Sequence, residues 1–210
     1  MVEIIPAIIG ENFRDLKPKI EAVEGLVNWV QLDVADGLFA PNWTWHNPDY
    51  LKTLDGKLKL EVHLMVEEPE AVIADWLPVV DRVLVHYEAT KHLAEIITQF
   101  KTSPVKLGLA VLLDTPLEKI EPELAEIKHL QLMGISQIGF QGQPLEEIIF
   151  TRLKTVREKF PDVTIAVDGG VTLANAEALI KAGANQLVIG SAIWESGDII
   201  TAIKKFQNVI

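Results

Sequence analysis

The feature that most constrains the fold of this chain is a repeated alternation of short apolar runs with longer amphipathic segments. Short runs rich in Val, Ile and Leu are typical of strands in a parallel sheet, and the amphipathic segments between them are typical of covering helices. Eight such strand and helix units follow one another. The predicted strands are residues 3–9, 28–34, 59–65, 82–87, 106–112, 129–135, 164–167 and 186–189.

The segments that follow these strands are predicted to be helical, because their apolar residues recur with helical spacing and their ends carry capping residues. The predicted helices are residues 12–25, 48–54, 69–77, 92–101, 116–124, 145–160, 173–182 and 193–206. No shift in composition and no low-complexity linker interrupts the pattern. We therefore expect one domain over residues 1–210.

A parallel sheet of this size either closes into a barrel or stays open with helices on both faces. Open sheets that bind dinucleotides carry a glycine-rich fingerprint just after the first strand, and this chain has only Gly10 there. The chain length is also close to that of closed barrels. We predict an α/β fold, a (β/α)8 TIM barrel, whose chemistry lies at the C-terminal ends of the strands.

The composition excludes several classes of function. A net charge of -11 and a pI near 4.9 argue against general binding to nucleic acid or to anionic membranes. The chain has no cysteine, so disulfides, thiolate metal sites and a cysteine nucleophile are ruled out. No apolar run is long enough to span a bilayer, and the first residues do not resemble a signal peptide. We expect a soluble, cytoplasmic protein.

Polar side chains stand at the ends of several predicted strands. Gln31 and Asp33 share one face of the second strand, His63 ends the third, His86 ends the fourth, and Asp168 follows the seventh. A single strand-end Asp is more often a turn or capping residue, but several polar strand ends on one rim favour a site. Two carboxylates facing each other suit proton abstraction beside a carbonyl, one as base and one as acid. That is the chemistry of an epimerase.

The second half of the chain carries three glycine-containing segments at strand ends. They are Gly139–Gln143 after the sixth strand, Gly169-Gly170 after the seventh, and Gly190-Ser191 after the eighth. Glycine lets the backbone approach a ligand closely, and backbone N–H groups at helix starts suit phosphate. A phosphate site in the last loops is a recurrent feature of barrels. The pattern predicts that an anionic ligand is held locally, by backbone groups.

The motifs along the chain resemble those of one family, the ribulose-phosphate 3-epimerases, from the first strand to the last. The shared motifs occur in the family's order, which makes chance unlikely as their source. They are Leu-Asp-Val-x-Asp-Gly from Leu32, Phe-x-Pro-Asn-x-Thr from Phe39, Val-His-Leu-Met from Val62, Val-His-Tyr-Glu-Ala from Val85, Thr-Pro-Leu-Glu from Thr115, Gly-Phe-x-Gly-Gln from Gly139, Val-Asp-Gly-Gly-Val from Val167, Ala-Gly-Ala-Asn from Ala182 and Gly-Ser-Ala-Ile from Gly190.

This resemblance implies that Asp33 and Asp168 exchange a proton at C3 of a pentulose 5-phosphate, converting D-ribulose 5-phosphate to D-xylulose 5-phosphate in the pentose phosphate pathway. It also implies that Asp33, His63 and Asp168 bind a divalent metal, Zn, Fe, Mn or Co, and that the protein is a homo-oligomer. The substrate-binding positions implied by the match are Ala7, Met65, Met133, Gly139, Gly142, Gly169, Gly170, Gly190 and Ser191.

The sequence departs from the family pattern around the reacting carbon. The second metal histidine falls at Gln31, whose amide is a much weaker ligand for zinc or iron and whose oxygen favours harder cations. Ala7 replaces a serine, Ala35 replaces a methionine, and about one residue is inserted near Gln137. We therefore expect metal binding to be weakened or absent and the epimerase activity to be reduced.

Two alternatives remain open from the sequence. One is a different phosphosugar barrel enzyme, of the aldolase or synthase type. The related hexulose-phosphate synthases carry a lysine two residues after their strand-end Asp, where this chain has Ala35. The other is a non-catalytic protein that binds phosphosugars.

Overall fold

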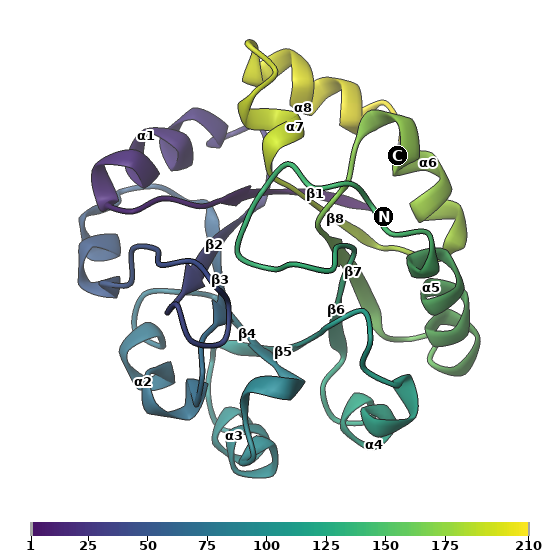
Figure 1. The fold of residues 1–210 in the computed structure, drawn as a ribbon. Coiled ribbons are helices and arrows are strands. Elements are labelled where there is room, and N and C mark those ends of the chain that lie inside the picture. The colour runs from purple at the N-terminus through teal and green to yellow at the C-terminus, as the bar shows by residue number, and fades with distance from the viewer. Residues whose placement is uncertain (1, 210) are drawn as a thin grey trace.

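The computed structural model shows a closed barrel of eight parallel strands, paired in chain order from β1 to β8. It describes residues 2–209, so Met1 and Ile210, the ends of the predicted domain, lie outside the described residues. Figure 1 looks along the barrel axis, with the helices forming an outer ring. The strands are β1 (Glu3–Ile8), β2 (Trp29–Ala35), β3 (Lys59–Met65), β4 (Arg82–His86), β5 (Lys106–Val111), β6 (His129–Met133), β7 (Thr164–Asp168) and β8 (Gln186–Ile189).

The predicted (β/α)8 fold is thus confirmed, and every predicted strand is present. The α-helices are α1 (Phe13–Val23), α2 (Ile73–Trp76), α3 (Leu93–Phe100), α4 (Glu121–Leu124), α5 (Ile148–Lys159), α6 (Leu173–Ala182), α7 (Ser191–Trp194) and α8 (Ile199–Gln207). Short 3-10 helices are η1 (Pro48–Thr53), η2 (Pro69–Ala71), η3 (Tyr87–Ala89) and η4 (Leu117–Lys119).

Four predicted helices differ from those observed. Residues 48–54 form only η1, and the predicted helices at 69–77 and 116–124 are each a 3-10 turn followed by one α-helical turn. Within 116–124, Pro122 lacks the N–H that a continuous helix would use, whereas Pro48 and Pro69 stand at first-turn positions that tolerate proline. The predicted helix at 193–206 is two helices, α7 and α8, separated at Gly197, whose φ of 76° is left-handed.

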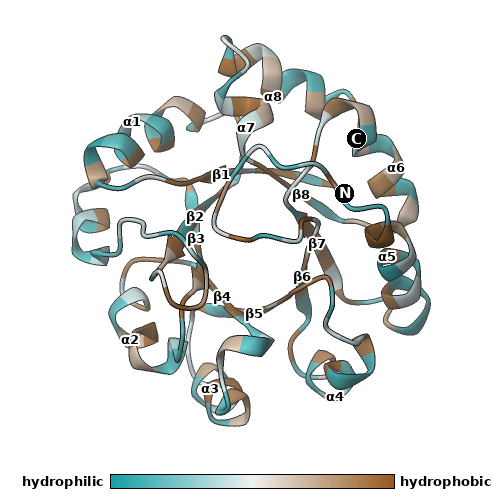
Figure 2. Cartoon of the chain, viewed as in Figure 1, coloured by the Kyte–Doolittle hydropathy of each residue, from teal (hydrophilic) through white to brown (hydrophobic). Residues whose placement is uncertain are grey.

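Strand alternation separates the barrel interior from the surface that the helices cover. Val30, Leu32 and Val34 of β2 face the helices and are buried in the large apolar core between the two layers. Figure 2 shows strands and helices in which hydrophobic and hydrophilic residues alternate. The other face of β2, with Gln31 and Asp33, looks into the barrel. The predicted site residue Asp33 therefore lies inside the barrel, with Gln31 deeper on the same strand.

The N-terminal end of the barrel interior is filled by a buried ion network. Arg82 donates from Nε to Oε2 of Glu61 (2.7 Å), its Nη1 lies 2.8 Å from Nδ1 of His129, and its guanidinium lies 4.1 Å from the ring centre of Trp29. Burial raises the pKa of Glu61 to about 7 although Arg82 opposes this shift. This network closes one end of the barrel and leaves the other end for a site.

Two long connections shape that other end, the mouth of the barrel. The segment between β6 and α5 passes over the mouth in Figure 1 and is joined to the loop after β2, where Nδ2 of Asn42 donates to the backbone oxygen of Gly139 (2.6 Å). Thr44, in the same loop, donates from Oγ1 to the backbone oxygen of Asp33 (3.1 Å). No helix within residues 2–209 is long and apolar enough to cross a membrane.

Candidate active site

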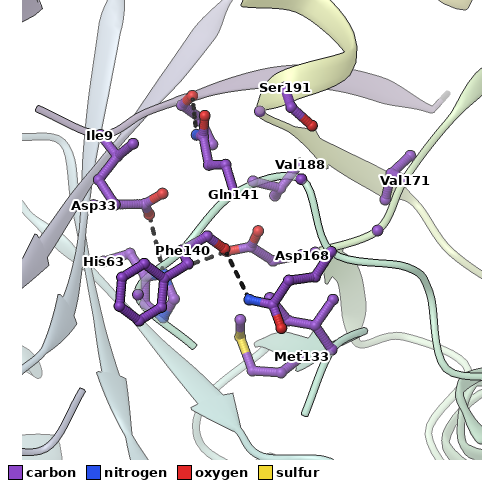
Figure 3. A pocket seen from close by; sticks show the side chains of 18 of the residues that line it. Ile9, Asp33, His63, Met133, Phe140, Gln141, Asp168, Val171, Val188 and Ser191 are labelled. Carbon is purple, nitrogen blue, oxygen red and sulfur yellow. Dashed lines mark hydrogen bonds and ion pairs between the residues drawn. The ribbon is translucent and has the colours of Figure 1, made fainter. Parts of the chain in front are cut away.

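A cavity of about 130 Å³ opens at the C-terminal ends of the strands. The close-up in Figure 3 shows side chains from several strands converging on it. Its lining includes every predicted metal-binding and substrate-binding residue apart from Gln31, which lies beneath it. These lining residues are Ala7, Asp33, His63, Met65, Met133, Gly139, Gly142, Asp168, Gly169, Gly170, Gly190 and Ser191.

Asp33 and Asp168 face each other across this cavity in Figure 3. One oxygen of each carboxylate is tied to the buried interior: Nε2 of Gln31 donates to Oδ1 of Asp33 (2.8 Å) and to Oδ2 of Asp168 (2.8 Å). Within residues 2–209 no hydrogen bond reaches the second oxygen of either carboxylate, although both side chains keep some exposure, 9% and 12%. Each acid therefore has one oxygen that is held and one that is available to a ligand.

His63 lies between the two acids and is fully buried. Its Nδ1 is 3.2 Å from Oδ1 of Asp33 and 3.3 Å from Oδ2 of Asp168. On the other side of the ring, Nε2 lies 2.8 Å from Nε2 of His86. His86 is in turn 3.4 Å, through Nδ1, from Oε2 of Glu88. A continuous chain of polar groups thus runs from the acid pair to the start of the loop after β4.

Burial and hydrogen bonding shift the pKa values of these polar groups in opposite directions. Burial disfavours a charged His63, but hydrogen bonds and charges from Asp168 and Asp33 outweigh it and raise the pKa of His63 to about 9. Burial lowers the pKa of His86 to about 4. Burial, reinforced by the charge of Asp168, raises the pKa of Asp33. The acid pair thus favours the charged form of His63, whereas burial favours the neutral form of His86.

Asp33, His63 and Asp168 could hold a metal ion, because their ligand atoms all lie within 4.8 Å of one another. Four ligands about 2.0 to 2.1 Å from a tetrahedral zinc stand about 3.3 to 3.4 Å apart. The separations of 3.2 and 3.3 Å between His63 and the two acids match this spacing. These three residues fit a divalent cation.

Gln31 does not complete this set as a histidine would. Its Nε2, 2.8 Å from each acid and 3.4 Å from Nδ1 of His63, stands where a fourth ligand would stand. An amide N–H is a donor and binds no cation, while the amide oxygen of Gln31 is buried without a hydrogen-bond partner. The amide would have to turn over to offer that oxygen to a metal.

The glycine segments surround the side of the cavity away from His63. Gly169 and Gly170 have φ angles of 97° and 71°, a region that side chains strongly disfavour, so the turn after β7 requires glycine. No Lys or Arg lines the cavity within residues 2–209. An anion bound there would be held by backbone groups and by neutral side chains such as Ser191 and Thr172.

Three residues in or below this cavity were not predicted as site residues. Gln131, two residues before Met133 on the inward face of β6, donates from Nε2 to Oδ2 of Asp168 (2.8 Å). Gln141 reaches across the mouth and donates to the backbone oxygen of Ala7 (3.0 Å). His86 was noted only as a strand end. A polar residue inside an apolar strand was the available signal for Gln131.

Comparison with known proteins places this geometry in a family. The family model described as the Ribulose-phosphate 3 epimerase family matches residues 3–194. The chain belongs to the ribulose-phosphate 3-epimerase family. The predicted family is thereby confirmed, and with it the predicted enzyme class, an isomerase acting on carbohydrate phosphates.

Named relatives agree with the family match. The chain is 34% identical to the ribulose-phosphate 3-epimerase of Bacillus subtilis over 217 residues, which cover 99% of both chains. It is 38% identical to the chloroplastic ribulose-5-phosphate-3-epimerase of Arabidopsis thaliana over 212 residues, 96% of this chain and 74% of that protein.

Solved structures with lower identity share only the fold. A 3-hexulose-6-phosphate synthase aligns over 100% of both chains with a TM-score of 0.73 and 18% identity. The orotidine 5'-monophosphate decarboxylase of Sulfolobus solfataricus aligns over 100% of this chain and 98% of its own, with a TM-score of 0.70 and 15% identity. These matches confirm the barrel.

Proposed function

We propose that the chain interconverts D-ribulose 5-phosphate and D-xylulose 5-phosphate through Asp33 and Asp168. The observation that carries this assignment is that the two carboxylates face each other across one cavity, each with an unbonded oxygen. The hydrogen at C3 of a ketose phosphate is acidic because it is next to the carbonyl carbon. One carboxylate removes this proton, and the resulting enediolate takes a proton from the other acid on the opposite face. The configuration at C3 is inverted.

The rest of the cavity supports substrate placement. Met65 and Met133 flank the acid pair with apolar surface, and the segments around Gly142, Gly170 and Ser191 surround the region proposed for the phosphate. Backbone N–H groups can hold a phosphate without basic side chains, so an acidic protein can still bind one. Ala7 lines the same cavity without a hydroxyl, so it offers the substrate no side-chain hydrogen bond.

Asp33, His63 and Asp168 are the residues that would hold a divalent cation in this site. When bound, such a cation supplies positive charge that stabilises the negative charge of the enediolate. Two carboxylates and one imidazole suit several divalent metals, among them zinc, iron and manganese.

Exchange of the C3 hydrogen tests this function directly. In heavy water, NMR of ribulose 5-phosphate with the protein should show loss of the C3 proton signal together with the appearance of xylulose 5-phosphate. Asp33→Asn and Asp168→Asn should each lower the rate of xylulose 5-phosphate formation by at least about a hundredfold, because inversion needs a proton-transfer group on each face of C3.

The matched control is Asp162→Asn, which makes the same change at an exposed position before β7. Its rate should equal that of the wild type. Binding of ribulose 5-phosphate with no exchange in the wild type would instead support a non-catalytic phosphosugar binder. Formation of xylulose 5-phosphate at the wild-type rate in Asp168→Asn would remove that residue from the mechanism.

A further inference from the structure

A second glutamine, Gln131, is buried beneath the acid pair and has no part in the proposed reaction. It is fully buried on β6, where its neighbours Leu130 and Leu132 face the helices. Its Nε2 lies 2.8 Å from Oδ2 of Asp168 and 3.3 Å from Nδ1 of His63. Its amide oxygen is buried without a hydrogen-bond partner. Burying an unpaired carbonyl costs free energy, so an apolar residue would serve packing better.

Strand register places Gln131 and Gln31 in one layer below the acids. Met133 pairs with Asp168 across β6 and β7, and Gln131 lies one interior position deeper, level with Ala166. Gln31 likewise lies one interior position below Asp33 on β2. We refer to Gln31 and Gln131 as the amide floor. It lies directly under the acid pair and above the ion network of Arg82.

Both amides of this floor donate to the same atom, Oδ2 of Asp168, from different strands. Gln131 approaches from β6, next to β7, and Gln31 approaches from β2 across the barrel. A carboxylate held by one donor can still rotate about its Cβ–Cγ bond. Two donors on different strands fix the plane of the group and so fix the direction of Oδ1.

We propose that Gln131 is a positioning residue for proton transfer at C3, acting through Asp168. This inference rests on the proposed epimerase function. Gln131 and Gln31 donate to Oδ2 from two strands, in addition to Nδ1 of His63 at 3.3 Å, so that Oδ1 points into the cavity at the reacting carbon. Errors in placement of about 1 Å at a reacting group cost about a hundredfold in rate, so a donor that fixes the carboxylate has a large effect.

The test uses Gln131→Met, which keeps the length of the side chain and removes its N–H donor. We expect kcat to fall about ten- to a hundredfold while KM for ribulose 5-phosphate stays within about twofold, because the phosphate contacts are untouched.

The matched control is Gln186→Met. Gln186 is also a buried interior glutamine that donates to a carboxylate, Oε2 of Glu3 (2.7 Å), and also has an unpaired amide oxygen, but it lies at the opposite end of the barrel. Its kcat should equal that of the wild type.

A double substitution separates positioning from a general loss of packing. Because both amides act on one oxygen, Gln31→Met combined with Gln131→Met should lower kcat by less than the product of the two single effects. Equal falls of kcat in Gln131→Met and Gln186→Met would assign the effect to packing and overturn the proposal. An unchanged kcat in Gln131→Met would also overturn it.

Crystal structures of wild type, Gln131→Met and Gln186→Met provide a readout that needs no activity. We expect the carboxylate of Asp168 to rotate or to take two conformations in Gln131→Met only. An unmoved Asp168 in that variant contradicts the positioning role even if kcat falls. A wild type without exchange at C3 would overturn the epimerase function alone, and the structures would still decide whether Gln131 orients Asp168.

Discussion

At the scale of single residues, the orientation of the Gln31 amide determines whether the acid pair faces a hydrogen-bond donor or an oxygen that could bind a metal. Nε2 of Gln31 faces two carboxylate oxygens, and its own oxygen has no hydrogen-bond partner. The reverse orientation would place an amide oxygen against two acceptors, so the hydrogen bonds fix the assignment. In this orientation Gln31 acts as a neutral donor to the acid pair, at the position where the family resemblance implies a metal-binding histidine.

Replacing this residue should create the missing ligand. Gln31→His offers an imidazole nitrogen next to Asp33, His63 and Asp168, which would give four ligands at tetrahedral spacing. Protein purified with added zinc and then dialysed should retain close to one zinc per chain, against much less in the wild type. Calorimetry should show affinity at least about tenfold higher, and the exchange rate should rise with metal content.

The control for this change is Gln186→His, which adds a histidine to the barrel interior far from the acid pair. Its zinc content should match the wild type. If Gln31→His shows neither a higher zinc content nor a higher exchange rate, then Gln31 does not limit metal binding. The predicted effect of this departure from the family would then be wrong.

At the scale of elements, the connections after β6, β7 and β8 decide the shape of the cavity. A Cβ on Gly170 would lie 2.5 Å from the backbone nitrogen and Cα of Leu145, in the connection between β6 and α5. A Cβ on Gly190 would meet the amide of Gln141, also at 2.5 Å. The glycines here therefore allow neighbouring loops to pack against each other, in addition to any contact with phosphate.

Gly170→Ala should separate two of these loops. The backbone of Leu145 must shift to admit the methyl group, so we expect KM for ribulose 5-phosphate to rise about tenfold or more and the melting temperature to fall. The matched control is Gly197→Ala. Gly197 has a similar φ, 76° against 71°, but no atom lies within 4 Å of its Cβ position. That variant should lose stability of about 1 kcal/mol and keep its KM. An equal rise of KM in both variants would assign the effect to backbone strain.

At the scale of the whole molecule, the barrel keeps its chemistry at one end and its buried ion network at the other. His129 belongs to this network, where burial, Arg82 and Lys106 all hold its pKa well below the ordinary value. It stays neutral in the folded protein at pH values where an unfolded chain would protonate it. Below about pH 6.5 the unfolded state therefore binds one more proton, and stability falls as the pH falls.

His129→Gln should flatten this dependence, because its amide oxygen can still accept from Arg82 but does not titrate. Urea unfolding between pH 6.5 and 5.5 should show a slope lower than in the wild type by about 1 kcal/mol per pH unit, because the unfolded histidine is half protonated at the upper end of this range. The exposed His92 provides the control, and His92→Gln should keep the wild-type slope. An unchanged slope in His129→Gln would mean that this histidine is charged in the folded protein.

The predictions of a homo-oligomer and of a cytoplasmic location remain predictions. Large apolar side chains are exposed near the mouth of the barrel, with Leu38 74% and Trp43 59% accessible, which is compatible with a subunit interface. One relative is chloroplastic, so family membership does not fix the compartment.

The sequence by itself determined the barrel and the identity of the acid pair. Eight alternations of strand and helix can be predicted from short windows of sequence, since the periodicity of apolar residues is a property of neighbouring residues. Asp33, His63 and Asp168 were identified because strand ends of a barrel must meet at one rim. The family motifs then named the reaction, and the glycine segments predicted loops around one cavity, as observed. Helix lengths after β2, β3 and β5 were overestimated, because apolar spacing over so few residues does not distinguish an α-helix from short 3-10 turns.

Only the tertiary structure decided how the acids are held. Gln31 and Gln131 are a hundred positions apart, and no local pattern shows that both amides reach Oδ2 of Asp168. The same is true of the contact between His63 and His86 and of the reach of Gln141 to Ala7. Hydrogen bonds inside a barrel join residues brought together by strand register and closure. Their partners are therefore set by the closed fold, while the sequence fixes only which side chains face inward.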